Sequence, residues 1–492
     1  MGAAFGQCLG IDHGLPPSDY RPPGSTATAM EGDDDERAPR TLQYTAHPNW
    51  AWVVHDAVRD IVGSGEETPP RWCKRQSELP SQAVASAAHN REKPVYALFK
   101  VEAEVTTTDG RTVAAAVWAS SQCLGFLDAK DALYRELKRA GKASLMPDTV
   151  LIPWDAASVD AIADFPTTPA LLKSALGSGG FGLYFVTEKQ HALAIMQAHA
   201  TRARQFSGFL DGLKRDHDGA VPSWSIQAVV NTLRVGEQQQ QQKQQSQSQP
   251  QPQPQPQRQR RCQVRAYVAL CEHGDRVGVY LLRDLEVRLP SWAVDLDATL
   301  AATPTASPEE PADRAMASRR LLEDFASGQT LSVEEFEEAC CAGGAGRPYN
   351  LDRNKAETER VMLHEVPELA GAHEVVLAAV RDAMMALQPA IVARRTRDAL
   401  TKEGHAVANR TQMAIAGVDL LVEREQPDSG AFRAYLVEIN NNPALPQEHR
   451  KKSAHYQVHL VRMVANMLRL GLAYSEGIAN EDLERLRFER VF

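Results

Sequence analysis

The fold of this chain is indicated most clearly by Gly-Val-Asp-Leu-Leu-Val (residues 417–422) and Tyr-Leu-Val-Glu-Ile-Asn-Asn-Asn-Pro (residues 435–443). Each is an apolar run of strand type interrupted by acidic or amide side chains, and the turn-rich residues between them favour an antiparallel hairpin. Glu438 and Asn440 are two residues apart, so on a strand they project from the same face. We therefore expect Asp419, on the neighbouring strand, to lie close to both.

Three oxygen-bearing side chains on rigid strands are typical of a magnesium site. Mg²⁺ takes few ligands from the protein and completes its shell with water and nucleotide phosphates. The sequence thus predicts that Asp419, Glu438 and Asn440 bind Mg²⁺ together with a nucleotide. The alternative is a pair of edge strands whose acidic residues are simply solvated.

The bulk properties narrow the class of protein. A chain of 492 residues is long enough for two or three domains, and its net charge of -9 argues against general binding to nucleic acid. The seven cysteines show no CxxC spacing, which indicates a reducing compartment and no zinc site.

We expect no transmembrane or secretory segment, because no apolar run has the required length. Acylation of Gly2 or Cys8 stays open, since Gly6 replaces the Ser or Thr of a myristoylation signal.

Composition also divides the chain into segments. Residues 1–45 lack apolar anchors, and residues 236–261 contain poly-Gln and Gln-Pro repeats, so both are expected to be disordered. Between and after them we expect a small N-terminal α/β domain (46–145), a central subdomain (146–235), a C-terminal subdomain (262–475) with a variable insertion at about 298–348, and a C-terminal tail (476–492).

Hydrophobic periodicity predicts a mixed α/β (α+β) fold with mixed layers, because helices and strands alternate irregularly. Helices are expected at 128–140, 189–213, 375–402 and 454–472. Strands are expected at 170–173, 182–186, 226–230, 264–270, 277–282, 415–422 and 432–439.

A glycine-rich loop follows the strand that ends at Lys173. Glycine lets several backbone N–H groups approach an anion, and a lysine at the strand end adds a positive charge for a polyphosphate. The loop glycines and serine are Gly177, Ser178, Gly179, Gly180 and Gly182. The loop lacks the GK[ST] ending of a Walker A motif and leads into a strand, which favours a flap over phosphates. The alternative is a flexible hairpin.

Taken in order, these motifs resemble the tubulin–tyrosine ligase-like family of ATP-grasp ligases. The resemblance runs from about Phe126 to Leu472. It includes the lysine-bearing segment 127–133, the Met-Pro-Asp-Thr-Val-Leu-Ile-Pro segment 146–153, the glycine loop after Lys173, the hinge-like strand 226–230, Arg-Cys-Gln-Val-Arg-Ala-Tyr-Val at 261–268, the strand 280–283 and the two closing motifs at 417–419 and 438–443.

The resemblance implies an ATP-grasp fold, two cofactors and a set of site residues. Lys130 and Lys173, with the loop backbone, would hold the ATP phosphates. Gln227, Ala228, Val229 and Val230 would line the adenine slot. Arg265 and Arg283 would stabilise the transferring phosphoryl group or orient the acceptor carboxylate. Asp419, Glu438 and Asn440 would hold Mg²⁺ that bridges the phosphates.

The implied reaction activates a carboxylate as an acylphosphate and joins it to an amino group. The implied partners are a free amino acid and an acidic protein tail, such as that of tubulin, for a monomeric cytoplasmic enzyme associated with microtubules or cilia. Which amino acid is ligated stays open. Gln263, Gly179 and Ala228 depart from the family pattern, and the family's HxTN element has Asn350 as its nearest counterpart.

Two other functions remain open from the sequence. One is an ATP-grasp ligase for a different carboxylate, such as a small peptide, which the acidic net charge favours because an acidic enzyme repels acidic tails. The other is a nucleotide-binding scaffold without catalysis. The intact set Asp419, Glu438 and Asn440 speaks against a scaffold, which needs no metal ligands.

Overall fold

The structure, a computed structural model, describes residues 42–46, 57, 97–106, 112–120, 124–154, 162, 170–175, 183–186, 188–205, 222–230, 232–236, 259–274, 276–289, 359–401, 410–426, 430–441, 443, 454–474, 478 and 480–492. The expected disordered N-terminal residues before 42, most of the Gln/Pro insertion, the variable segment 298–348, Asn350 and the loop 177–182 lie outside the described residues.

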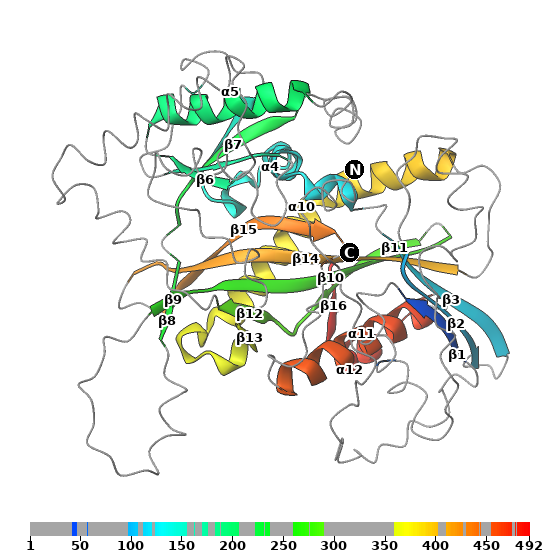
Figure 1. Ribbon diagram of the computed structural model, residues 1–492. Coiled ribbons are helices and arrows are strands. Elements are labelled where there is room, and N and C mark those ends of the chain that lie inside the picture. Colours follow the sequence, from blue (N-terminus) through cyan, green and yellow to red (C-terminus); the bar gives the residue numbers. More distant parts are fainter. Residues whose placement is uncertain are drawn as a thin grey trace, which may run out of the picture.

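A ten-stranded sheet forms the centre of the molecule (Figure 1). Its main path runs in the order β1-β2-β3-β14-β10-β11-β16; β15 pairs with β14, and β12 pairs with β10 and β13. The strands are β1 (Leu42–Ala46), β2 (Ala97–Thr106), β3 (Thr112–Ser120), β10 (Gln263–His273), β11 (Arg276–Leu282), β12 (Glu286–Leu289), β13 (Glu359–Met362), β14 (Arg410–Arg424), β15 (Phe432–Asn441) and β16 (Phe488–Arg490).

Most pairings in this sheet are antiparallel; β3 and β14 run parallel. Strands β2 and β3 belong to the expected N-terminal domain, and through β3 they continue the large sheet. Strand β1 pairs with β2, although it lies almost wholly in the segment 1–45 that the sequence predicts to be disordered. At the other end of the chain, β16 pairs with β11, so the C-terminal tail also belongs to the sheet.

Helices cover both faces of the large sheet. On one face lie α4 (Lys130–Arg139) and α10 (Ala372–Thr401), and on the other lie α11 (Ala454–Tyr474) and α12 (Asn480–Arg485). Residues of β10 alternate between the two cores: Val264 and Val268 face α10, whereas Tyr267 and Ala269 face α11. This double burial explains why β10 is a nearly continuous apolar run. Short 3₁₀ helices complete the layers: η3 (Gly125–Asp128), η4 (Ala143–Leu145), η6 (Leu363–Glu365) and η7 (Pro367–Leu369).

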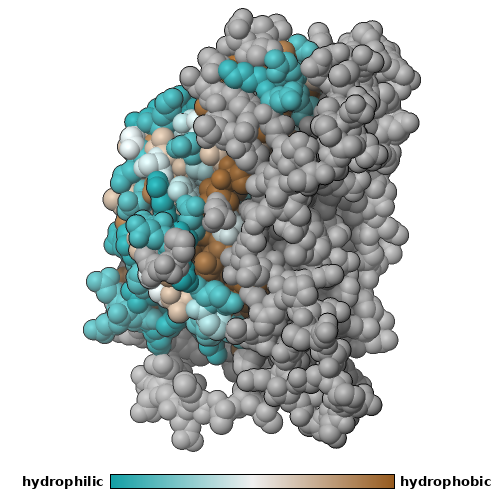
Figure 2. All heavy atoms as spheres, turned by 90° about the vertical axis from the view of Figure 1, so that its left-hand side faces the viewer, coloured by the Kyte–Doolittle hydropathy of each residue, from teal (hydrophilic) through white to brown (hydrophobic). Residues whose placement is uncertain are grey.

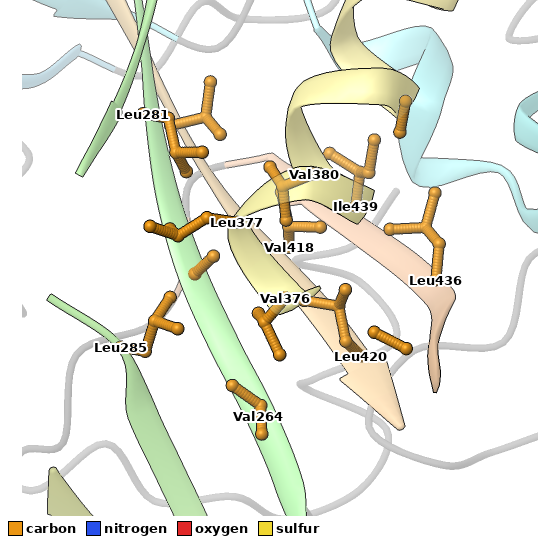
Figure 3. Packing of buried hydrophobic residues seen from close by; sticks show 14 of the residues in the cluster. Val264, Leu281, Leu285, Val376, Leu377, Val380, Val418, Leu420, Leu436 and Ile439 are labelled. Carbon is orange, nitrogen blue, oxygen red and sulfur yellow. The ribbon is translucent and has the colours of Figure 1, made fainter. Parts of the chain in front are cut away.

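The core under α10 is built from aliphatic side chains (Figure 3). Val376, Leu377 and Val380 pack against strand residues that include Val418 and Ile439, and all are at most 1% exposed. Complete burial of such a side chain contributes about 1.5–3 kcal/mol. Within the described part of the chain, α10 is the one helix that is long and apolar enough to cross a membrane by length and composition; its buried residues also fit the core helix seen here.

A second, four-stranded antiparallel sheet has the order β4-β7-β5-β6. Its strands are β4 (Thr149–Pro153), β7 (Ser223–Ala228), β5 (Ala170–Lys173) and β6 (Leu183–Val186), and α5 (Lys189–Gln205) packs against it. Trp154 and Trp224 stack with ring centroids 4.9 Å apart, and His199 meets Trp224 edge-on. The small sheet therefore has a core of its own.

The short strands β8 (Arg234–Gly236) and β9 (Gln259–Arg261) pair at the two ends of the Gln/Pro insertion. On the face of the molecule shown in Figure 2, hydrophobic residues form a band beside a largely hydrophilic surface. The structure thus consists of helices and antiparallel sheets in mixed layers, as the sequence predicts at this level.

Candidate functional site

Three charged residues lie side by side across three neighbouring strands of the large sheet. Arg265 on β10 is opposite Asp419 on β14, and Asp419 is opposite Glu438 on β15. The hairpin expected from the sequence is therefore the β14–β15 pair, and it places Asp419 and Glu438 next to each other. Asn440 is opposite Gly417, one pleat further along.

A β-bulge sets the direction in which Glu438 and Asn440 point. The register shifts between Asp419 and Leu420, because Val437 is an extra residue in β15. Before the bulge, Leu436 faces the α10 core, and a regular strand would point Glu438 into the same core. The extra residue reverses the alternation, so that Ile439 enters the core instead and Glu438 points to the side of Asp419.

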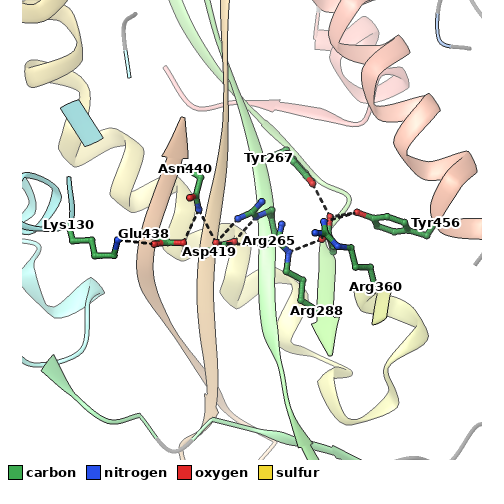
Figure 4. Close-up of polar contacts among 10 residues, drawn as sticks. Lys130, Arg265, Tyr267, Arg288, Arg360, Asp419, Glu438, Asn440 and Tyr456 are labelled. Atoms are coloured by element: carbon green, nitrogen blue, oxygen red, sulfur yellow. Dashed lines mark hydrogen bonds and ion pairs between the residues drawn. The ribbon is translucent and has the colours of Figure 1, made fainter. Parts of the chain in front are cut away.

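Hydrogen bonds join the members of this row (Figure 4). Arg265 donates from Nε and Nη2 to the two carboxylate oxygens of Asp419, each at 2.6 Å. The Asn440 amide nitrogen donates to Asp419 Oδ2 at 2.9 Å and to Glu438 Oε1 at 3.1 Å. Lys130 Nζ, at the start of α4, lies 3.5 Å from Glu438 Oε2. The sequence-predicted metal residues and Lys130 thus form one contact network.

Gly417 makes room for this network. A Cβ atom at this position would lie 3.1 Å from Arg265 Nε and 3.0 Å from Pro443 Cβ. Both distances are shorter than ordinary van der Waals contacts. The glycine therefore lets the Arg265 guanidinium lie across β14 to reach Asp419.

The electrostatics of the two carboxylates differ. Burial acts to raise the pKa of Glu438, but Lys130 and the Asn440 amide outweigh it and lower that pKa to about 2. Burial raises the pKa of Asp419, and Arg265 and Arg288 oppose the rise. The two-pronged pair with Arg265 requires Asp419 in its carboxylate form.

These residues fit a magnesium ion by their donor chemistry. The Asn440 amide nitrogen lies between two carboxylates, where a cation would also be attracted, and rotating the amide by half a turn presents its oxygen instead. Each carboxylate oxygen has two lone pairs, so the contacts with Arg265 and Lys130 leave acceptor capacity. Among the described residues no group of three His, Cys, Asp or Glu side chains is placed for a metal. A metal ion beside Asp419 and Glu438 would take the amide oxygen of Asn440 as its third protein donor.

A second charged cluster adjoins the row. Arg288, on β12, has its Nη1 3.9 Å from Asp419 Oδ2 and donates from Nε to Glu286 Oε1 at 2.9 Å. Arg360, on β13, donates to the same Glu286 oxygen at 3.0 Å. Sequence reasoning missed these residues. The signal for them was the pair of charges two residues apart in Glu-Val-Arg-Leu (286–289), which indicates a polar face on an otherwise apolar strand.

Arg283, the second arginine expected at the site, lies elsewhere. Its backbone N–H donates to the Arg487 carbonyl at 2.9 Å, and its carbonyl accepts from His373 Nε2 at 2.8 Å. Among the described residues, no hydrogen bond or ion pair joins the Arg283 side chain to the Asp419 row. The structure places Arg288 near Asp419 and leaves Arg283 beside the C-terminal residues.

On the small sheet, Lys173 ends β5 and is 3% exposed. Its Nζ donates to Gln227 Oε1, and the Gln227 amide nitrogen donates to Thr149 Oγ1 at 3.0 Å. Burial, followed by the charge of Lys130, lowers the pKa of Lys173 to about 7. A phosphate group near Lys173 would favour its charged form.

The remaining adenine-slot residues continue from the end of β7. Ala228 and Val229 are half-buried and Val230 is buried; the Ala228 N–H donates to the Asp148 carbonyl at 2.8 Å. The loop residues Gly177, Ser178, Gly179, Gly180 and Gly182 lie outside the described residues. The structure therefore brings Lys173 and Gln227 into contact on the two inner strands of the small sheet, and Ala228, Val229 and Val230 follow at the end of β7.

Helix α4 connects the two sheets at the site. Its first residue, Lys130, contacts Glu438 on the large sheet. The next, Asp131, accepts from the Ser223 N–H of the small sheet at 2.9 Å and pairs with Arg135 at 3.0 Å. Arg135 also donates to Ser223 Oγ at 2.6 Å. Lys130 and Asp131, which are consecutive residues of α4, thus contact the large sheet and the small sheet respectively.

No family model matches the chain, and a comparison with curated proteins finds no match either.

Proposed function

We propose that this chain is an ATP- and Mg²⁺-dependent ligase of tubulin–tyrosine ligase-like type, with an ATP-grasp fold. The single observation that supports it most is the row Arg265–Asp419–Glu438 with Asn440 and Lys130 attached. Two carboxylates, one amide and a lysine within one network suit a metal-bound polyphosphate. A solvated edge strand would not need a buried arginine fork on Asp419.

In this proposal Lys130 and Lys173 bind phosphate oxygens, and the residues from Gln227 to Val230 receive the adenine. Asp419, Glu438 and Asn440 hold Mg²⁺, which when bound supplies positive charge to the phosphates. Arg265 orients Asp419, because its Nε and Nη2 are already engaged there. Arg288 replaces Arg283 as the second arginine that faces the transferring phosphoryl group.

The reaction proceeds in two displacements. An acceptor carboxylate oxygen attacks the γ-phosphorus, the bond to the β–γ bridging oxygen breaks, and ADP leaves. The amine of the second substrate then attacks the acyl carbon of the acylphosphate, inorganic phosphate leaves, and the nitrogen loses a proton to give an amide or isopeptide bond. The enzyme contributes position and charge neutralisation.

We propose a free amino acid and an acidic protein tail, such as that of tubulin, as the two substrates, for an enzyme of the cytoplasm associated with microtubules or cilia. The net charge of -9 favours a second candidate, a ligase for a small peptide carboxylate, because long-range repulsion opposes an acidic tail. The basic groups near the site act on a tail only at short range.

The test supplies the purified protein with ATP, Mg²⁺, tubulin and each labelled amino acid in turn. A parallel reaction uses tubulin whose C-terminal tails have been removed by protease. Incorporation into intact tubulin alone supports the proposal. Equal incorporation into both, or none into either while ATP is still hydrolysed with a small carboxylate, would overturn the tubulin proposal and favour the peptide ligase. Nucleotide binding without any turnover identifies a scaffold.

A further inference from the structure

The carboxylate of Glu286 is enclosed by four hydrogen-bond donors. Its Oε1 accepts from Arg288 Nε at 2.9 Å and Arg360 Nη1 at 3.0 Å, and its Oε2 accepts from Tyr267 at 2.9 Å and Tyr456 at 2.6 Å. The side chain has no exposed surface. Four donors fill the acceptor capacity of a carboxylate, so Glu286 has none left for a metal, a proton or a substrate.

The strand register explains what this carboxylate does. Arg288 on β12 is directly opposite Arg360 on β13, and like charges in that relation repel each other. Glu286 accepts from both guanidinium groups and so holds them together. An arginine side chain can adopt many rotamers. The hydrogen bond from Arg288 Nε to Glu286 selects one in which Arg288 Nη1 points toward Asp419.

The charges of the cluster are unequal. Arg265, Arg288 and Arg360 carry three positive charges against the two carboxylates Asp419 and Glu286, and every one of these residues is at most 5% exposed. Buried charge is normally compensated by a partner. One positive charge in excess therefore favours an anionic ligand beside the pair Asp419–Arg288.

We infer that Glu286 is a positioning residue that orients Arg288 toward the terminal phosphoryl group of the nucleotide. Glu286 is itself held in place by hydrogen bonds from Arg360 and from Tyr456 of α11 (Figure 4). Glu286 touches neither substrate nor metal and acts through Arg288. This inference rests on the proposed function. It adds a link from the site to α11.

The test measures nucleotide binding without turnover. Dissociation constants for a non-hydrolysable ATP analogue, AMP-PNP, and for ADP are compared by calorimetry in Mg²⁺, using the full chain. Loss of one oriented charge-assisted contact weakens binding by about tenfold or more. Glu286→Gln should therefore weaken AMP-PNP by about that factor and leave ADP, which lacks the terminal phosphoryl group, within about twofold.

Two further variants test whether a lost preference comes from the orientation of Arg288, from the changed net charge of the cluster or from a general loss of structure. The double variant Glu286→Gln with Arg360→Gln removes one charge of each sign, so it protects the fold if the single variant is unstable, and the preference for AMP-PNP should remain lost. Glu489→Gln breaks another carboxylate–arginine pair, between β16 and Arg381 of α10, and should leave the preference unchanged.

The outcomes are distinct. A retained preference in Glu286→Gln, a preference restored in the double variant, or an equal loss of AMP-PNP and ADP affinity would each overturn the positioning role and leave the proposed function standing. A wild-type protein that binds neither nucleotide would overturn the proposed function, and the inference with it.

Discussion

Arg265 and Asp419 face each other across β10 and β14 and are joined by two hydrogen bonds of 2.6 Å. Both side chains are buried, so removing either partner would leave an uncompensated charge in the sheet. The pair fixes the direction of the Asp419 carboxylate before any ligand arrives. The site is therefore organised by the sheet itself.

We predict that Glu438→Gln abolishes ligation and preserves the fold. The substitution removes one of two carboxylates in the metal set, and the expected loss of turnover is about 10³-fold. Turnover and thermal unfolding are measured on the same preparation. Glu425→Gln, an exposed carboxylate on the same hairpin, is the control and should retain full turnover. Activity of Glu438→Gln above a tenth of the control would contradict the metal assignment.

Gly417→Ala should disturb the Arg265–Asp419 pair, because the new Cβ would lie 3.1 Å from Arg265 Nε. Such overpacking reduces the free energy of unfolding by about 1–3 kcal/mol. Chemical denaturation measures it. The matched control is Gly430→Ala, where no atom lies within 4 Å of the new Cβ, and its stability should stay within about 0.5 kcal/mol of wild type. Equal stability of both variants would contradict this prediction, because it would mean that the Arg265 side chain moves away from the new methyl group without a loss of free energy of unfolding.

The Gln/Pro insertion should be dispensable for stability. Gly236 of β8 is paired with Gln259 of β9, so residues 237–258 can be replaced by an Asn-Gly turn of hairpin type. A shorter loop has a smaller closure entropy, so the melting temperature should stay the same or rise slightly. Differential scanning calorimetry on the wild type and the shortened chain checks this. A fall of several degrees would mean that the insertion contributes packing.

Nucleotide binding near pH 8 should take up protons. The pKa of Lys173 is about 7 in the folded chain, below its ordinary 10.5, and polyphosphate would raise it. Binding at pH 8 should therefore take up as much as about one proton, and less at pH 6, where the lysine is already charged. Calorimetry in buffers of different ionisation enthalpy measures the uptake. The control Lys142→Met, at an exposed lysine, should not change the proton uptake. Absence of proton uptake in the wild type would contradict the prediction.

The same lysine affects stability with a definite sign. Because its pKa is lowered on folding, the unfolded chain binds the proton more tightly between about pH 7 and 10.5. The contribution of Lys173 to the free energy of unfolding therefore rises with pH across that window. Lys173→Met should flatten the rise, which denaturant titrations at several pH values measure.

The sequence predicts the β14–β15 hairpin well. Strands expected at 415–422 and 432–439 become Arg410–Arg424 and Phe432–Asn441, and Asp419, Glu438 and Asn440 share contacts. Local apolar patterns and turn residues suffice for this, because the two strands are adjacent in the chain.

Other parts of the site depend on distant pairings that local patterns do not reveal. Glu286 and Arg360 are 74 positions apart, and a segment outside the described residues separates their strands. The bulge at Val437 adds one residue without any special sequence signal, although it decides the face of Glu438. The metal roles, the nucleotide and the substrates remain predictions.

The position of β3 beside β14 has a consequence for synthesis of the protein. β3 ends at Ser120, and its partner strand begins at Arg410, about 290 residues later. At about 5–20 residues per second, the ribosome needs roughly 15–60 s to produce the partner. During that interval the edge of the β1-β2-β3 ribbon has no β14 to pair with. An unpaired strand edge favours aggregation, so we expect the nascent chain to be most prone to aggregate in this interval.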